Sequence, residues 1–107
     1  MTVEKSWIEV CGIEDIDIED VLRFDHLGQT FAIYRSVEDT FHATAGLCTH
    51  ECAYLADGLV IGDLIECPKH NGRFNYKTGE AKRVPAKVAL ETYRVKVEAD
   101  RVLVELP

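Results

Sequence analysis

Two short segments constrain the fold of this 107-residue chain more than any other feature of its sequence. Each contains one cysteine and one histidine, as Cys48-Thr-His50 and as Cys67-Pro-Lys-His70, with 16 residues between His50 and Cys67. Both segments interrupt apolar runs, and glycines beside them allow the backbone to turn closely around a ligand. If the four side chains form one site, the fold must bring two loops together.

The rest of the sequence predicts short β-strands joined by turns. Apolar and polar residues alternate in several runs, and residues 93–106 alternate on both sides of an Ala99-Asp100 turn. Gly28, Gly62-Asp63 and Gly79 mark further turns. The expected strands are Trp7–Val10, Val21–Asp25, Thr30–Tyr34, Phe41–Ala45, Leu59–Ile61, Leu64–Glu66, Arg73–Tyr76 and the two halves of residues 93–106. This pattern predicts an all-β fold, a small antiparallel sandwich or barrel.

Length and composition predict one ordinary domain. An apolar fraction of 47% argues against disorder, and no run of 18 apolar residues is present that could span a membrane. The first ten residues lack the basic and apolar regions of a signal peptide. We expect a single cytoplasmic domain over residues 1–107 that acts as a monomer, with its cysteines reduced.

Charge is distributed unevenly along the chain, whose formal net charge is −7. Residues 1–40 carry ten acids and three bases, whereas residues 67–87 carry six bases and only Glu80 as an acid. Because a nucleic-acid-binding domain is usually basic overall, we do not expect that activity. The basic stretch from Lys69 to Lys87 is either a solvated surface or a docking rim for an acidic partner protein.

Two cysteines and two histidines could bind zinc or an iron–sulfur cluster. Structural zinc sites usually pair cysteine with cysteine and histidine with histidine, whereas both pairs here are mixed. A mixed pair suits a cluster of two irons, because each loop can give its cysteine to the inner iron and its histidine to the outer iron. The two-iron interpretation is therefore favoured over zinc.

The pattern Cys48-x-His50-x16-Cys67-x2-His70 resembles the Rieske 2Fe–2S motif, in which two histidines replace two cysteines on one iron. The similarity extends to Glu66-Cys67-Pro-x-His70-x-Gly72-Arg73-Phe74 and to Thr78-Gly79. The resemblance implies a Rieske fold, with a β-sandwich or barrel base and a two-loop cluster-binding subdomain at about residues 46–86. It implies one 2Fe–2S cluster, with Cys48, His50, Cys67 and His70 as its ligands.

Positions around these ligands separate subgroups of the Rieske family. Respiratory members carry an extra cysteine in each cluster loop and join the two by a disulfide, whereas Ala53 and Lys69 stand at the matching places here. High-potential members also have a serine and a tyrosine whose hydroxyls bond the cluster sulfurs. Gly72 and Phe74 occupy these positions here. Without those donors the reduced cluster is less stabilised, so we predict a midpoint potential of about −150 mV, at the low end of the Rieske range.

The resemblance therefore implies a soluble Rieske ferredoxin similar to those of bacterial multicomponent aromatic-ring dioxygenase systems. Such a protein is not itself an enzyme. It carries single electrons from a flavin-containing NAD(P)H reductase to a terminal oxygenase. Two alternatives stay open at this point: a Rieske-like small subunit of an assimilatory nitrite reductase, and a zinc-stabilised interaction module.

The remaining cysteines and histidines have simpler interpretations. Cys11 ends a predicted strand and is expected to be a small structural residue, and Cys52 is expected to pack near the cluster as a thiol. His26 lies beside a hairpin turn and His42 lies in a strand. Neither histidine has a ligand partner at a useful spacing.

Overall fold

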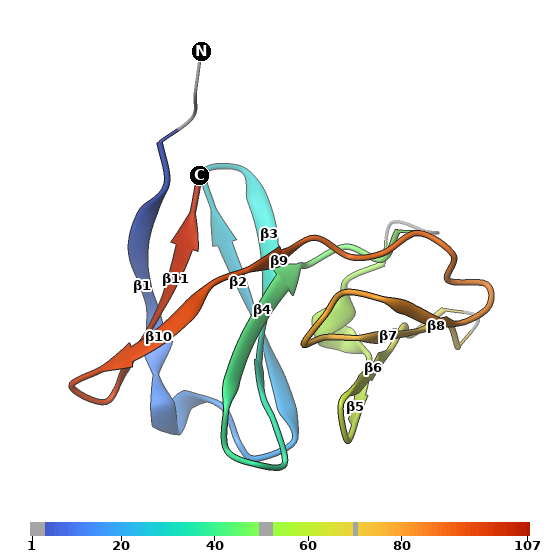
Figure 1. Cartoon of the computed structure of the whole chain (residues 1–107), viewed down its shortest axis with the longest axis horizontal. Helices are drawn as coiled ribbons and strands as arrows, with labels where there is room; N and C mark the ends of the chain where they lie inside the picture. Colours follow the sequence, from blue (N-terminus) through green and yellow to red (C-terminus); the bar gives the residue numbers. More distant parts are fainter. Residues whose placement is uncertain (1–3, 50–52, 70) are drawn as a thin grey trace.

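Antiparallel β-strands make up nearly all of the regular structure (Figure 1). The computed structural model describes residues 4–49, 53–69 and 71–107. The elements are β1 (Ser6–Gly12), η1 (Ile13–Asp15), β2 (Asp20–His26), β3 (Gln29–Arg35), β4 (Phe41–Ala45), η2 (Leu55–Asp57), β5 (Leu59–Ile61), β6 (Leu64–Glu66), β7 (Arg73–Asn75), β8 (Ala81–Arg83), β9 (Thr92–Tyr93), β10 (Val95–Glu98) and β11 (Arg101–Leu106). No helix in the described part of the chain is long and apolar enough to cross a membrane.

Three sheets pack around two hydrophobic cores. Their strand orders are β1-β11-β10, β2-β3-β4-β9 and β5-β6-β7-β8. Strand β3 belongs to both cores because successive side chains of a strand point to opposite faces. Phe31 and Ile33 join the core shared with β11, whereas Ala32 and Tyr34 join the core shared with the β5–β8 sheet. The predicted all-β fold is confirmed, with the β2-β3-β4-β9 sheet as the middle layer.

Several predicted turns have the backbone that a tight hairpin requires. Leu27 and Gly28 both have positive φ between β2 and β3, and Ala99 and Asp100 do so between β10 and β11. Two central residues with positive φ are typical of the turns that match the twist of a two-stranded ribbon. Gly79 has the predicted positive φ, at +84°, in the turn between β7 and β8.

The sequence did not predict two short strands. Residues 81–83 form β8, which pairs with β7 at the edge of the third sheet. Tyr93 was expected in the same strand as Val95, but it belongs to β9 and lies opposite Ala43 of β4. The chain therefore changes sheets at Arg94, since Val95 pairs with Val104 of β11. The expected strand at residues 73–76 also ends one residue early, at Asn75.

Polar contacts fix the β5–β8 sheet against the rest of the fold. The Lys77 ammonium lies 2.6 Å from the Glu38 carboxylate, in the β3–β4 turn, and 3.0 Å from the Asp63 carboxylate, in the β5–β6 turn. The buried Tyr76 hydroxyl donates to the Gly62 carbonyl at 2.7 Å. The Gly62 N–H in turn donates to the Glu19 carboxylate at 2.9 Å.

Candidate metal centre

The first predicted ligand loop begins directly after β4. Gly46 allows this close approach, because a Cβ atom there would lie 2.8 Å from the Thr30 carbonyl carbon and would overlap the Thr30 side chain. The Cys48 N–H then donates to the Ala53 carbonyl at 2.9 Å, and Leu47 forms an isolated bridge with Tyr54. The chain therefore leaves and re-enters the fold at adjacent points, with Cys48 at the base of the loop.

The second predicted ligand loop is built in the same way. It connects β6 to β7, and the Cys67 N–H donates to the Gly72 carbonyl at 2.7 Å. Glu66 and Arg73 lie opposite each other just outside this bond. The Arg73 guanidinium holds the Glu66 carboxylate at 2.7–2.8 Å, with both side chains partly buried. In each loop, then, the cysteine N–H bonds the carbonyl five residues later.

Both cysteines are buried in one apolar cluster. Cys48 is 5% exposed and Cys67 is 0% exposed, and both belong to the core that also contains Leu55, Phe74 and Ala86. Thiol groups held together at the bases of two loops, among apolar side chains, form a donor set suited to iron ligated by thiolates. The described residues therefore fit the sulfur end of a 2Fe–2S cluster.

The other two predicted ligands, His50 and His70, lie outside the described residues, as does Cys52. Each histidine falls within the loop that its cysteine opens, between the two residues joined by the closing hydrogen bond. Their role as ligands stays a prediction.

A third segment, residues 83–90, completes the walls of the centre. Ala86 and Leu90 are buried in the same core as the cysteines. The Thr49 hydroxyl, from the first loop, donates to the Val88 carbonyl at 2.6 Å. The Leu90 N–H donates to the Gly79 carbonyl at 2.7 Å. The sequence indicated most of this segment only as part of the basic stretch, and the partner of Thr49 could not be foreseen because it lies 39 residues away.

Hydroxyl groups near the loops donate to the backbone. Thr49 donates to Val88, and Tyr76, which stacks on Tyr34 in the same core, donates to Gly62. Phe74, at the position where high-potential relatives carry a tyrosine, is fully buried. The low midpoint potential stays a prediction.

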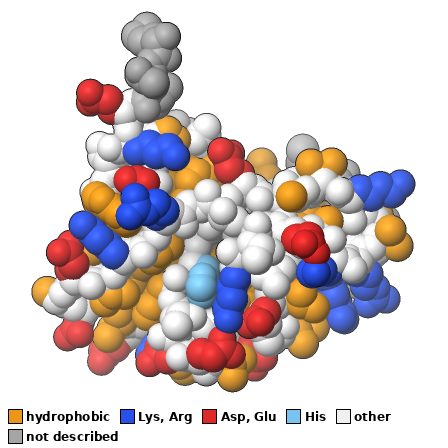
Figure 2. All heavy atoms as spheres, in the orientation of Figure 1, with side chains coloured by type: hydrophobic (Ala, Val, Ile, Leu, Met, Phe, Trp, Pro, Cys, Tyr) orange, Lys and Arg blue, Asp and Glu red, His pale blue; other side chains and the backbone are white. Residues whose placement is uncertain are grey.

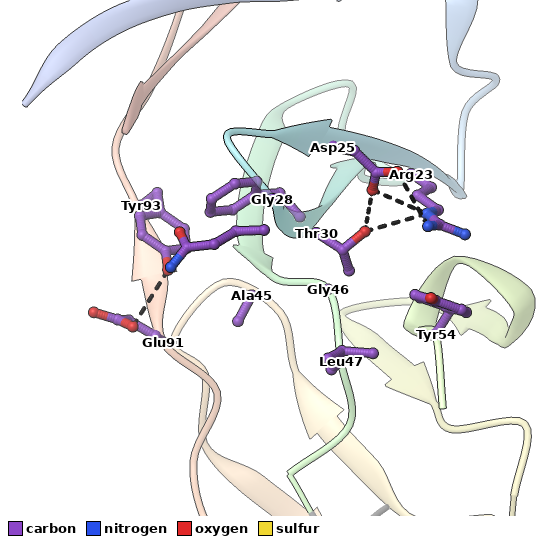
Figure 3. A pocket seen from close by; sticks show the side chains of 12 residues that line it. Arg23, Asp25, Gly28, Thr30, Ala45, Gly46, Leu47, Tyr54, Glu91 and Tyr93 are labelled. Carbon is purple, nitrogen blue, oxygen red and sulfur yellow. Dashed lines mark hydrogen bonds and ion pairs between the residues drawn. The ribbon is translucent and has the colours of Figure 1, made fainter. Parts of the chain in front are cut away.

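A groove of about 480 Å³ lies behind the first loop, between the middle sheet and η2 (Figure 3). The Arg23 guanidinium covers the Tyr54 ring at 3.9 Å and bonds the Asp25 carboxylate at 3.0 and 3.1 Å. Bonds from Arg23 and from the Thr30 hydroxyl hold the pKa of Asp25 below its ordinary value. Neither Cys48 nor Cys67 lines this groove. Arg23 contacts Tyr54, where the first loop ends, so the groove supports that loop structurally.

Several cations of the predicted docking stretch, Lys69 to Lys87, form ion pairs within the chain. Of its cations, Arg73 is paired with Glu66, and Lys77 bridges Glu38 and Asp63. Lys82, on β8, contacts Glu80, which directly precedes that strand. Figure 2 shows Lys and Arg side chains gathered at the end of the molecule where Figure 1 places β7 and β8.

The other cysteine and histidines have the expected structural roles. Cys11 is buried at the irregular end of β1, and burial raises its pKa. His26 ends β2 and stacks on Phe24. His42, on β4, lies 2.8 Å from the Thr40 hydroxyl. Burial first, and the nearby Lys77 charge second, lower the pKa of His42.

Comparison with known families identifies the centre. Residues 6–94 match the Rieske [2Fe-2S] domain. The chain belongs to the Rieske family. The predicted family and its single 2Fe–2S cluster are thereby confirmed, and the zinc alternative loses its support.

Curated relatives that are 30% or more identical to this Rieske protein include ferredoxin components of dioxygenase systems. The ferredoxin component of the naphthalene 1,2-dioxygenase system of Pseudomonas putida is 43% identical over 106 residues, which cover 99% of each chain. A solved complex of reduced oxygenase and oxidized ferredoxin in carbazole 1,9a-dioxygenase contains a chain that superposes with a TM-score of 0.88 at 39% identity, covering 92% of each. The predicted class, an electron-transfer component that is not itself catalytic, is confirmed.

The nitrite reductase alternative rests on fold alone. The putative NADH-dependent nitrite reductase small subunit of Mycobacterium tuberculosis superposes with a TM-score of 0.84, covering 98% of each chain, but at only 17% identity. That likeness shows a shared Rieske fold and carries no assignment of function.

Proposed function

We propose that this ferredoxin takes single electrons from a flavin-containing NAD(P)H reductase and delivers them to a terminal oxygenase, in the cytoplasm and as a monomer. The relatives named as ferredoxin components of dioxygenase systems support the oxygenase as partner. Residues 1–107 act as one domain, with the cluster-binding subdomain at about residues 46–86. A Rieske cluster, when bound, supplies reversible one-electron chemistry.

The ligand set in this proposal is Cys48 and Cys67 on the inner iron and His50 and His70 on the outer iron. The observation that carries it is the burial of both cysteines in one core, each at the base of a loop closed by the same backbone bond. Phe74, Ala53 and Ala86 are buried in the same core as both cysteines and would exclude water from the thiolate sulfurs.

Single substitutions of the histidines test this assignment. His50→Ala and His70→Ala should each abolish the visible absorption and the EPR signal of the reduced centre, and should lower the bound iron. His26→Ala and His42→Ala are matched controls that should keep the centre, because these residues lie on β2 and β4 of the base. An intact Rieske spectrum in either ligand variant would remove that histidine from the set.

A reconstituted assay tests the carrier role. NADH-dependent turnover by a purified reductase and oxygenase should require this protein, and the Cys48→Ser variant should not support it. Turnover of equal rate without the ferredoxin would contradict the proposal.

A further inference from the structure

The segment from Arg83 to Val88 exposes an uncommon combination of side chains beside the first cluster loop. We name residues 83–88 the cationic strap. Val84 is 70% exposed and Val88 is 64% exposed, and Arg83 and Lys87 are exposed next to them. Two well-exposed apolar side chains, each next to a cation in the sequence, are typical of a surface that another protein covers.

The strap is held firmly although its side chains face solvent. Ala86 is 4% exposed and packs in the core that contains Cys48 and Cys67. The Ala86 N–H donates to the Arg83 carbonyl at 3.1 Å, and the Val88 carbonyl accepts from Thr49. Since Thr49 lies between Cys48 and His50, a protein that covers the strap also approaches the first cluster loop.

The charges of the strap differ from those of neighbouring cations. Arg73, Lys77 and Lys82 each contact a carboxylate of this chain. Within residues 4–49, 53–69 and 71–107, Arg83 and Lys87 make no ion pair. Their charges are therefore available to a partner, on a molecule whose net charge of −7 would otherwise repel an acidic protein.

We propose that the cationic strap docks an acidic face of a redox partner protein, with Val84 and Val88 against an apolar centre and Arg83 and Lys87 against surrounding carboxylates. This inference rests on the proposed carrier function and specifies the partner surface. Charge complementarity of this kind acts mainly on the rate of encounter and weakens with salt.

The test measures electron transfer by stopped-flow absorbance from the pre-reduced protein to two haem proteins of opposite charge. Cytochrome b5 is the acidic acceptor, and cytochrome c is the basic one. The variant carries Arg83→Glu and Lys87→Glu. Its matched control carries Arg94→Glu and Lys96→Glu, which change the net charge equally near β10, at the opposite end of the molecule from β8 (Figure 1).

At low salt, the strap variant should reduce cytochrome b5 at least about tenfold more slowly than the wild type. The control variant should slow cytochrome b5 reduction much less, and the difference in rate between the two variants should shrink as salt is added. Cytochrome c should show no such loss. Equal slowing by the strap and control pairs, or no slowing by either, would overturn the docking proposal.

Iron content, EPR spectrum and midpoint potential are measured for every variant before the kinetics. A wild type without a Rieske signal would overturn the proposed function itself. Intact centres with unchanged potentials and no strap-specific slowing would overturn only the docking inference. Val84→Ser with Val88→Ser should slow cytochrome b5 reduction by an amount that salt does not remove, since it alters apolar contact and not charge.

Discussion

Replacing Gly79 by alanine should destabilise the fold and loosen the walls of the metal centre. Gly79 has φ +84°, and a Cβ atom there would overlap the Leu90 carbonyl oxygen. The left-handed backbone costs an L-residue about 1–2 kcal/mol. Moving the backbone oxygen adds the cost of overpacking, about 1–3 kcal/mol. The expected loss in the free energy of unfolding is therefore about 2–5 kcal/mol.

Gly62→Ala is the matched control for this prediction. Gly62 also has positive φ, at +58°, but no atom lies within 4 Å of the Cβ position. This variant should lose only the cost of the left-handed backbone, about 1–2 kcal/mol of unfolding free energy. Urea unfolding, followed by circular dichroism and by the visible absorption of the cluster, measures both variants.

The two glycine variants should also differ at the metal centre. The Gly79 carbonyl accepts the Leu90 N–H, and Leu90 packs in the core with both cysteines. Gly79→Ala should therefore release iron to a chelator faster than Gly62→Ala, under conditions in which both proteins stay folded. Equal unfolding free energies for the two variants would refute the steric argument, and equal iron release would refute the link from Gly79 to the centre.

Three further predictions concern the centre and its surroundings. Glu66→Gln should lower the free energy of unfolding by about 1 kcal/mol and speed iron release to a chelator. The exchange Glu66→Arg with Arg73→Glu should restore most of that loss. No recovery would contradict a stabilising ion pair at the base of the second loop. Redox titration should give a midpoint near −150 mV, and Phe74→Tyr should raise it by adding a hydroxyl donor; a clearly positive wild-type midpoint would contradict this. The His42 imidazole should titrate below its ordinary pKa of about 6.5 by NMR, and Lys77→Gln should raise that pKa. Because the folded protein resists protonation of His42, this residue's contribution to stability is complete above about pH 6.5 and is lost as the pH falls further. An increase in stability on acidification through this range would contradict the lowered pKa.

Local sequence patterns predicted those parts of the fold that local chemistry decides. The hairpin at Leu27-Gly28 and the turn at Ala99-Asp100 follow from Gly28 and Asp100, which tolerate positive φ, between alternating strands. The two mixed cysteine and histidine pairs gave the family and the cofactor, because few sites need that combination of ligands.

Tertiary contacts decided what the sequence could not show. Strand β8 has only three residues, too few to show an alternation of apolar and polar side chains. Tyr93 joins a different sheet from Val95, because Tyr93 pairs with β4 whereas Val95 pairs with β11. Lys77 belongs to a predominantly basic stretch in the sequence, yet it forms an ion pair with Glu38, 39 residues away. Which cations remain available to a partner therefore became visible only in the structure.

EPR spectroscopy of the dithionite-reduced protein, combined with iron, sulfide and zinc analysis, decides whether this chain holds a Rieske cluster. We expect two irons and two acid-labile sulfides per chain, with hyperfine coupling to two imidazole nitrogens. A colourless protein that contains zinc and no sulfide, after expression with ample iron, would contradict it.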